Sequence, residues 1–441
     1  MKEYTQFATS IKDRPVAVFG LARSGLSAVR ALKRAEVNVF AWDDDAKGRK
    51  LAEEAGALVV PLVADNLKDC AFLLLSPGVP LHYPEPHPVV KAARDAGIEI
   101  ICDIELFSRI YDNIRTIGIT GTNGKSTTTA LIHHILKSAG RPTVMGGNIG
   151  VPVFDLEIKD KPFVVLELSS YQLDLCPTFR PEISVLLNIT PDHIDRHGTL
   201  ENYAASKARI FEGQGVAIIS TDDAPSRKIV EQVKAKTHRL VIPISMQDKE
   251  VEKLKNNMIL KGEHNYQNAL AAYHACRAAA LSEEEILEGL RTFPGLVHRQ
   301  FPVRTIGNVT YINDSKATNA DAASKALVSY DNIYLVAGGR PKEGGLNGLE
   351  NLMSRVKESF LIGEAMDDFA SWMKKNGVKH QKNKTLDVAV LAAHRSAQTD
   401  PAAAVVLLSP ACASWDQFSS YEERGDVFAR LVNSLEESAA A

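Results

Sequence analysis

The sequence predicts an α/β protein of three domains, each built on a largely parallel sheet. Its 441 residues would make about three domains at roughly 150 residues each. Short apolar runs alternate with helical patterns along almost the whole chain, which is typical of parallel strands joined by crossover helices. Two glycine-rich turns directly follow apolar runs, as in folds where a strand passes into a helix beside a bound phosphate.

The first domain is expected over residues 1–105 as a Rossmann-like unit. Its apolar runs lie at 15–19, 37–42, 72–75 and 98–102. The first run is followed by Gly20 and by an amphipathic stretch that carries Leu26, Val29 and Leu32 on one side. That spacing predicts a helix packed on the sheet.

The second and third domains show the same alternation. The second, expected over 106–299, has apolar runs at 115–119, 163–168, 183–187 and 216–219 and a helix around 265–280. The third, expected over 300–441, has runs at 309–312, 333–336 and 405–408. We expect a central domain of the P-loop ATPase type with a mostly parallel sheet, and a Rossmann-like C-terminal domain.

Charge and cysteine usage narrow the functional class. The 51 basic and 54 acidic residues leave a net charge of -3, which argues against a sequence-independent nucleic-acid binder. The five cysteines are scattered and form no C-x-x-C pair, so a reducing compartment is favoured over a disulfide framework. No apolar run is long enough to cross a bilayer and no signal core opens the chain. These features predict a cytoplasmic protein, and nothing in them requires more than a monomer.

The best local signal is a glycine-rich loop between a strand and a helix. It comprises Thr120, Gly121, Thr122, Asn123, Gly124, Lys125, Ser126 and Thr127. Backbone N–H groups of such a loop can surround nucleotide phosphates, with Lys125 at the terminal phosphates and the Ser126 hydroxyl on Mg²⁺. Ile119 stands where the usual motif has its first glycine. The alternative is a plain glycine-rich turn with a solvated lysine.

Three further residues are candidates for catalysis. Glu167 ends an apolar run, where a carboxylate faces the ligand crevice of a parallel sheet and suits Mg²⁺, although a solvated strand-end acid is equally compatible. His193 lies in an H-x-D-x-H loop with Asp195 and His197, a spacing that matches no standard zinc site.

Lys207 shares one side of a predicted helix over 200–211 with apolar residues. Its ammonium could reach water by snorkelling. Burial would instead lower its pKa and leave a neutral amine. Both explanations are open at this point.

The N-terminal turn Gly20 to Gly25, followed by Asp43, imitates a dinucleotide fingerprint. It suggests an NAD-dependent oxidoreductase as a rival function. However, Ala22 replaces the middle glycine that lets the backbone approach a diphosphate, so this signal is weak.

Taken in order, the motifs resemble the Mur ligases. The loop TGTNGKS is shared with these enzymes and with the related folylpolyglutamate synthases. Further segments resemble the branch that adds D-glutamate: 167–173 (ELSSYQL), 188–195, 313–319 (NDSKATN) and 409–418 (SPACASWDQF), with the Gly78 turn and the HNYQNAL segment. Together they spread over essentially the whole chain.

The resemblance implies an ATP-dependent ligase that joins D-glutamate to UDP-N-acetylmuramoyl-L-alanine through an acyl phosphate, in peptidoglycan precursor synthesis. It implies two Mg²⁺ ions held by Ser126, Glu167, His193 and Lys207, the last as a carbamate formed with CO₂. Lys125, Glu167, His193 and Lys207 would be the catalytic residues. The third domain would bind the incoming amino acid and close on ATP.

The remaining implied contacts fall into three groups. Those to ATP, beyond the phosphate loop, are Asn268, Arg299, Asp314 and Lys316. Those to the UDP-linked substrate are Arg23, Ser24, Asp43, Gly78 and Asn148. Those to D-glutamate are Thr318, Lys342, Ser414 and Tyr421. Asp44 and Asp45 stand where the family pattern has Thr and Arg.

Two other functional classes are alternatives to a D-glutamate ligase: a related ligase for another amino acid, and a non-catalytic ATP-binding module. A sibling ligase could add another amino acid, and a folylpolyglutamate synthase usually has G-K-G-S where this chain has Ser126 directly after Lys125. A non-catalytic ATP-binding module would lack Glu167, His193 and Lys207 together, whereas this chain has all three.

Overall fold

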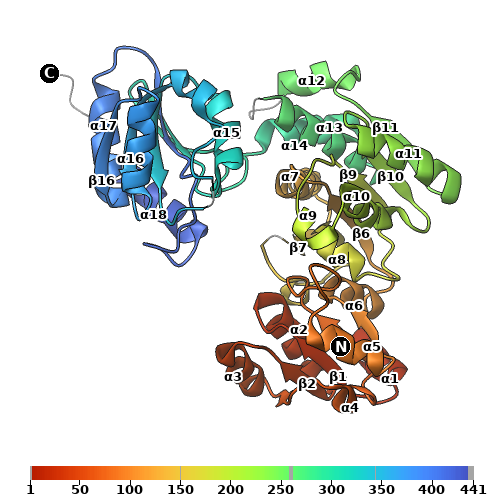
Figure 1. Cartoon of the computed structure of the whole chain (residues 1–441). Coiled ribbons are helices and arrows are strands. Elements are labelled where there is room, and N and C mark those ends of the chain that lie inside the picture. Colours follow the sequence, from red (N-terminus) through yellow and green to blue (C-terminus); the bar gives the residue numbers. More distant parts are fainter. Residues whose placement is uncertain (1, 149, 258–261, 343, 436–441) are drawn as a thin grey trace. The chain divides into compact units, whose positions relative to one another are not determined.

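The computed structural model describes residues 2–148, 150–257, 262–342 and 344–435. The chain divides into two compact units, Met1–Phe293 and Pro294–Ala441 (Figure 1). Unit 1 contains two sheets and unit 2 contains one. Unit 2 therefore begins six residues before the domain start expected at 300, while the expected division at 105/106 lies within unit 1 and stays a prediction.

The first sheet of unit 1 is parallel throughout, in the order β3-β2-β1-β4-β5. Its strands are β1 (Val16–Phe19), β2 (Val39–Trp42), β3 (Leu58–Val59), β4 (Phe72–Leu75) and β5 (Glu99–Ile101). Its helices are α1 (Lys2–Ser10), α2 (Arg23–Arg34), α3 (Ala46–Glu54), α4 (Ala64–Leu67), α5 (Pro88–Asp95) and α6 (Asp103–Ile110). The strand order reverses between β1 and β4, which is where open α/β sheets form their ligand crevice.

The second sheet of unit 1 is also parallel, in the order β11-β10-β9-β6-β8-β7. Its strands are β6 (Arg115–Thr120), β7 (Thr143–Gly147), β8 (Phe163–Glu167), β9 (Ile183–Leu186), β10 (Val216–Ser220) and β11 (Leu240–Ile244). The helical segments are α7 (Lys125–Ser138), η1 (Val153–Asp155), α8 (Ser170–Asp174), α9 (Ile194–His197), α10 (Leu200–Ala208), η2 (Arg209–Phe211), α11 (Ala224–Lys236), α12 (Glu250–Asn257), α13 (Glu263–Ala278) and α14 (Glu283–Thr292).

The sheet of unit 2 is mixed, in the order β12-β13-β17-β14-β15-β16, with β12 antiparallel to β13 and the other pairs parallel. Its strands are β12 (Phe301–Ile306), β13 (Val309–Asn313), β14 (Ile333–Gly338), β15 (Val356–Ile362), β16 (His380–Lys384) and β17 (Ala404–Leu408). The helical segments are α15 (Ala320–Ser329), η3 (Glu350–Arg355), α16 (Met366–Lys375), α17 (Leu386–Gln398) and α18 (Tyr421–Asn433).

Sequence and packing agree at the strands that lie beside the candidate site. All residues of β1, β4, β8 and β9 are buried, as their continuous apolar runs predict for strands covered on both faces. Helix α8 begins with a capping box in which Ser169 and Gln172 exchange hydrogen bonds, which fixes its first turn directly after Glu167. No helix among the described residues is long and apolar enough to span a membrane.

Candidate active site

The phosphate loop lies between the end of β6 and the start of α7. Gly121 and Gly124 have φ angles of +152° and +84°, which side chains rarely tolerate. A Cβ atom on Gly124 would lie 2.2 Å from the Oδ1 atom of Asn268 on α13. The loop is thus closed tightly against α13, and Asn268 lies beside it as the resemblance implies.

Residues after β9 hold this loop in place. The Asn123 N–H donates to Asn188 Oδ1 at 2.8 Å, and Asn188 Nδ2 donates back to the Asn123 carbonyl at 3.2 Å. The Thr122 hydroxyl accepts from the Thr190 N–H at 3.0 Å. Asn188 was not among the predicted site residues; its position directly after a buried strand was the available signal.

Two lysines converge on the carbonyl of Gly121. Lys125 Nζ donates to this oxygen at 2.9 Å and to the Thr122 carbonyl at 2.8 Å. Lys207 Nζ donates to the same Gly121 oxygen at 2.9 Å. Only 1% of Lys207 is exposed, so the snorkelling explanation is wrong. Burial, and next the positive charge of Lys125, lower the pKa of Lys207 well below its usual value.

A cluster of aromatic rings lies beside the Lys207 ammonium. Its Nζ atom lies 4.5 Å from the centre of the buried Tyr203 ring, and the Tyr203 hydroxyl is 3.2 Å from that of Thr122. The ring of His193 contacts both Tyr171 and Tyr203, with ring centres 5.1 and 6.3 Å apart. The fold therefore gathers Lys207, His193 and the phosphate loop around Tyr203.

Glu167 carries an unused oxygen in a buried setting. Its Oε1 atom accepts a hydrogen bond from Asn148 Nδ2 at 2.9 Å, whereas its Oε2 atom is buried and has no hydrogen-bond partner among the described residues. Such an atom is costly unless a ligand satisfies it. A hard cation is a ligand of the kind that can satisfy such an atom. Asn148, expected at the UDP-linked substrate, lies against Glu167.

His193 is held in a left-handed conformation, with φ +53°, at the start of α9. Its imidazole is about half exposed and lies 3.4 Å from Asp192. His197 faces inward, where Ser170 and Ser206 hydrogen-bond its two ring nitrogens at 2.9 and 3.3 Å. No group of three His, Cys, Asp or Glu side chains that could hold a metal occurs in the described chain, so any metal site here must also use other donors.

The predicted contacts of the first sheet lie at its carboxyl edge. The carboxylate of Asp43 accepts the backbone N–H groups of Leu21 and Asp45 and thereby joins the turns after β1 and β2. Arg23 donates to the Gly150 carbonyl at 2.9 Å. Ser24 is half-buried and Gly78 is exposed. Gly25 is required because a Cβ atom there would lie 1.9 Å from the Gly20 oxygen.

In unit 2, the predicted residue Asp314 follows β13 and is contacted by the loop after β17 and by the segment directly before β12. Asp314 accepts from the Ser409 hydroxyl at 2.7 Å and from the Gln300 N–H at 3.2 Å. Burial raises the pKa of Asp314 to about 7. Arg299 lies close enough to lower that pKa, and its Nε atom is buried without a hydrogen-bond partner among the described residues.

The residues that the resemblance implies for D-glutamate lie in loops of unit 2 as well. Lys342 Nζ is 3.5 Å from the Thr318 hydroxyl, and Lys316 Nζ lies 5.5 Å from the centre of the Tyr421 ring. Ser414 is buried, next to the backbone pairing of Arg340 with Ala413.

Arg424 supports these loops and was not predicted. It is 1% exposed. It donates to the Ser315 hydroxyl and carbonyl at 2.9 and 2.8 Å and to the Cys412 carbonyl at 3.1 Å. No local pattern indicates this role, because an arginine in a helix is usually solvated.

Comparisons with known proteins agree over the whole chain. Family models described as "Mur ligase middle domain" and "Mur ligase MurD-like, N-terminal domain" match residues 119–259 and 14–102. A protein of Caulobacter vibrioides (strain NA1000 / CB15N) named UDP-N-acetylmuramoylalanine--D-glutamate ligase is 46% identical, covering 96% of both chains. Proteins of the same name from Phenylobacterium zucineum and Agrobacterium fabrum are 43% and 45% identical, covering 98% and 97% of both chains.

The chain belongs to the Mur ligase family. Solved structures show the same fold at low identity. MurF from Acinetobacter baumannii superposes with a TM-score of 0.62 at 18% identity, over 98% of both chains. UDP-N-acetylmuramate-alanine ligase MurC from Thermotoga maritima gives 0.59 at 18%, over 96% of this chain and 99% of its own. The predicted three-domain α/β fold is confirmed, and the oxidoreductase rival is not favoured.

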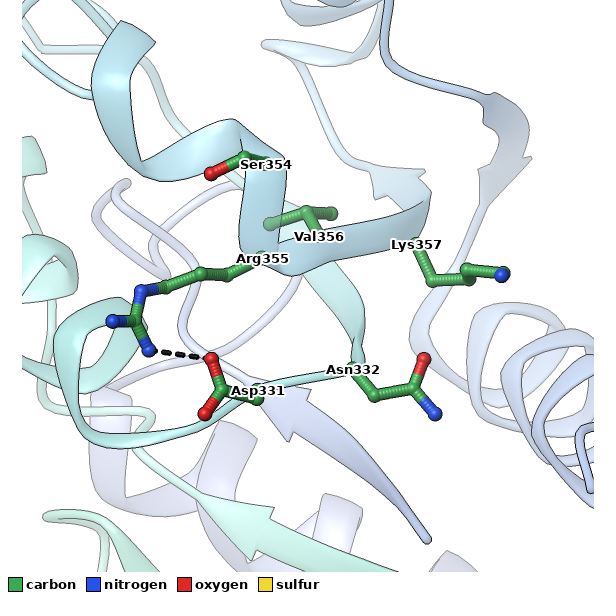
Figure 2. A pocket seen from close by; sticks show the side chains of 6 residues that line it. All are labelled: Asp331, Asn332, Ser354, Arg355, Val356 and Lys357. Atoms are coloured by element: carbon green, nitrogen blue, oxygen red, sulfur yellow. Dashed lines mark hydrogen bonds and ion pairs between the residues drawn. The ribbon is translucent and has the colours of Figure 1, made fainter. Parts of the chain in front are cut away.

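A surface pocket of about 580 Å³ lies in unit 2 of this Mur ligase. Figure 2 shows that Asp331 and Asn332 line it together with Ser354, Arg355 and Lys357. It lies at the amino ends of β14 and β15, with Arg355 paired to Asp331 at 2.6 Å. Ligands of parallel sheets bind at the carboxyl ends, so this pocket is not the active site.

Proposed function

We propose that this Mur ligase uses ATP to join D-glutamate to UDP-N-acetylmuramoyl-L-alanine. The observation that carries the proposal is the 43–46% identity, over nearly the full length, to proteins named for that reaction. The half-buried Lys125 and the buried Lys207 and Glu167 support it, because these groups suit the handling of phosphate and carboxylate charge.

ATP would bind with its phosphates on the loop from Thr120 to Thr127. Lys125 donates to two loop carbonyls, and it would turn to the terminal phosphates of bound ATP. Asn268 at the loop, and Arg299, Asp314 and Lys316 in unit 2, are the remaining proposed ATP contacts. The alanyl carboxylate then attacks the γ-phosphorus, ADP leaves, and an acyl phosphate forms.

Mg²⁺ suits this site and would neutralise phosphate charge there. The buried free oxygen of Glu167 and the hydroxyl of Ser126 are proposed to hold it, and His193 and Lys207 to hold a second ion.

For Lys207, we propose carbamylation. Its lowered pKa favours the neutral amine, whose nitrogen lone pair adds to the carbon of CO₂ while one N–H proton is released to solvent. The product is an anion with two oxygens, which a hard cation accepts. Because the neighbouring Lys125 is positive, this conversion places an anion beside a cation.

The second half-reaction is assigned to the loops of unit 2. Thr318, Lys342, Ser414 and Tyr421 would bind D-glutamate, with Lys342 as the charge partner of a carboxylate. The amine attacks the acyl carbon, phosphate leaves, and the ammonium proton is lost to give the amide. Arg23, Ser24, Asp43, Gly78 and Asn148 would bind the UDP-linked substrate.

The domain assignment follows the same proposal. Residues 1–105 would bind the UDP portion, 106–299 ATP, and 300–441 the incoming amino acid. We also propose a monomer that works in the cytoplasm, where these small-molecule substrates are made.

The deciding experiment measures phosphate release from ATP with UDP-N-acetylmuramoyl-L-alanine, with and without D-glutamate. Release that requires both supports the proposal. Release that requires a different amino acid keeps the ligase chemistry and contradicts the specificity. No release with any pairing contradicts the proposal as a whole.

A further inference from the structure

We infer that Arg196 is a substrate-positioning residue that binds an oxyanion of the UDP-linked substrate within unit 1. The inference rests on the proposed function for the identity of that substrate.

Arg196 connects the carboxyl edges of the two sheets of unit 1. It belongs to α9, the single turn that follows His193. Its Nη1 atom donates to the Gly78 carbonyl at 3.0 Å, in the turn that follows β4 of the first sheet. Arg196 therefore spans from the loop of a proposed metal ligand to the turn proposed to bind the UDP-linked substrate.

The side chain of Arg196 is preorganised. Its guanidinium carbon lies 4.7 Å from the centre of the Tyr171 ring, a cation–π contact. The Tyr171 ring is in turn stacked on His197, with ring centres 5.4 Å apart and an interplanar angle of 8°. His197 is fixed by Ser170 and Ser206. An arginine held in this way loses little conformational entropy when a ligand binds.

The charge of Arg196 is not compensated. In the described part of the chain, no carboxylate lies within ion-pair distance of its guanidinium, and the Gly78 carbonyl is its hydrogen-bond acceptor. Arg30 and Arg109, by contrast, pair with Asp155 and Glu99. A half-buried arginine with free N–H groups suits a bidentate oxyanion.

Arg23 is a second arginine that bridges the two sheets of unit 1. It reaches from the turn after β1 to the Gly150 carbonyl, which follows β7. Two arginines thus cross between the sheets in opposite directions, each ending on a carbonyl oxygen. The UDP-linked substrate offers two oxyanions of suitable chemistry, its diphosphate and its alanyl carboxylate.

The test compares Arg196→Met, which keeps an apolar side chain on Tyr171, with Arg196→Lys and with the control Arg30→Met. Arg30 also connects the two parts of unit 1, from α2 to η1. Unlike Arg196 it has an acidic partner, Asp155, at 3.5 Å. Calorimetric titration of each full-length protein with UDP and with UDP-N-acetylmuramoyl-L-alanine requires neither ATP nor D-glutamate.

We expect Arg196→Met to raise the Kd of UDP-N-acetylmuramoyl-L-alanine at least about 10-fold, the scale of one hydrogen bond to a charged group. Arg196→Lys should lie between it and the wild type, and Arg30→Met should stay within about twofold. In turnover, KM for the UDP-linked substrate should rise while KM for ATP and kcat change less than about threefold. If Arg196 had a purely structural role, its replacement would change KM for ATP and kcat as well as KM for the UDP-linked substrate.

Comparing UDP with UDP-N-acetylmuramoyl-L-alanine shows which oxyanion Arg196 binds, because only the second ligand carries the alanyl carboxylate. Equal weakening of both assigns Arg196 to the diphosphate, and weakening of the alanyl ligand alone assigns it to the carboxylate; each outcome supports the inference. Unchanged binding of both ligands, or an equal loss in Arg30→Met, overturns it. If binding depends on Arg196 but turnover does not require D-glutamate, the inference stands and the proposed amino acid is wrong.

Discussion

Replacing Arg424 with methionine removes the buried cation that holds the loops of unit 2. The guanidinium donates to the hydroxyl and carbonyl of Ser315 and to the carbonyls of Cys412 and Ala413. These loops carry Lys316 and Ser414, two of the proposed ligand contacts. The substitution should therefore affect both the stability of unit 2 and the binding of D-glutamate.

The size of the effect follows from two opposing contributions. The carbonyls of Ser315 and Cys412 would lose their buried donor, at about 2 kcal/mol each, which gives about 4 kcal/mol. The Ala413 carbonyl keeps the Arg340 N–H at 2.9 Å, and the Ser315 hydroxyl still donates to the Tyr421 carbonyl. Against this, burial lowers the pKa of Arg424 to about 10, a cost of about 3 kcal/mol that methionine avoids. The net destabilisation should be about 1 kcal/mol.

Differential scanning calorimetry and steady-state kinetics measure the two consequences. At about 2–4 °C per kcal/mol, the transition that reports unit 2 should move down by about 2–4 °C, and KM for D-glutamate should rise at least about 10-fold. Arg430→Met, an exposed position on the same helix α18, is the control. A Tm within about 1 °C of the wild type together with an unchanged KM would refute the reasoning.

Four further outcomes are expected. Lys125→Ala should lower kcat at least about 100-fold, and a tenfold loss or less would contradict its assignment to the phosphates. Gly124→Ala places a side chain at φ +84° against Asn268, so KM for ATP should rise at least about 10-fold and stability should fall by about 2 kcal/mol in urea unfolding. Lys207→Ala should be nearly inactive and partly rescued by formate or propionate; full activity without them would exclude the carbamate. Because burial lowers the pKa of Lys207, the unfolded chain holds that proton more tightly. The wild type therefore loses stability as pH falls below about 10.5. In bicarbonate-free urea titrations, Lys207→Met should be stabilised relative to the wild type at pH 7, and an advantage that persists undiminished at pH 11 would contradict this.

The positions of most internal strands could be predicted from the sequence. The apolar runs at 15–19, 72–75, 183–187 and 405–408 coincide with β1, β4, β9 and β17 to within one residue, because strands covered on both faces must be apolar throughout. The helix expected around 265–280 is α13, two residues displaced.

Edge strands could be predicted only in part. The apolar run at 98–102 contains the edge strand β5, whereas the edge strand β16, His380–Lys384, has the sequence HQKNK. An edge strand needs only one partner and little burial, so its sequence can lack an apolar pattern, as that of β16 does. The internal strand β15 was also missed, because its second and third residues are charged. There Glu358 is buried and paired with Lys379 at 3.0 Å.

What the sequence determined by itself was the set of local features: the three α/β segments, the phosphate loop with its glycines, and the unusual lysine at position 207. These follow from periodicity and from spacing along the chain, which depend on neighbours a few residues apart. Only the tertiary structure decided which of those features meet. It placed Asn148 on Glu167 and Lys207 beside Lys125, and it gave roles to Asn188, Arg196 and Arg424, whose partners lie 65, 118 and up to 109 residues away in sequence. Charge, desolvation and hydrogen bonding act through space, so residues without any local signal can define the site as firmly as the motifs do.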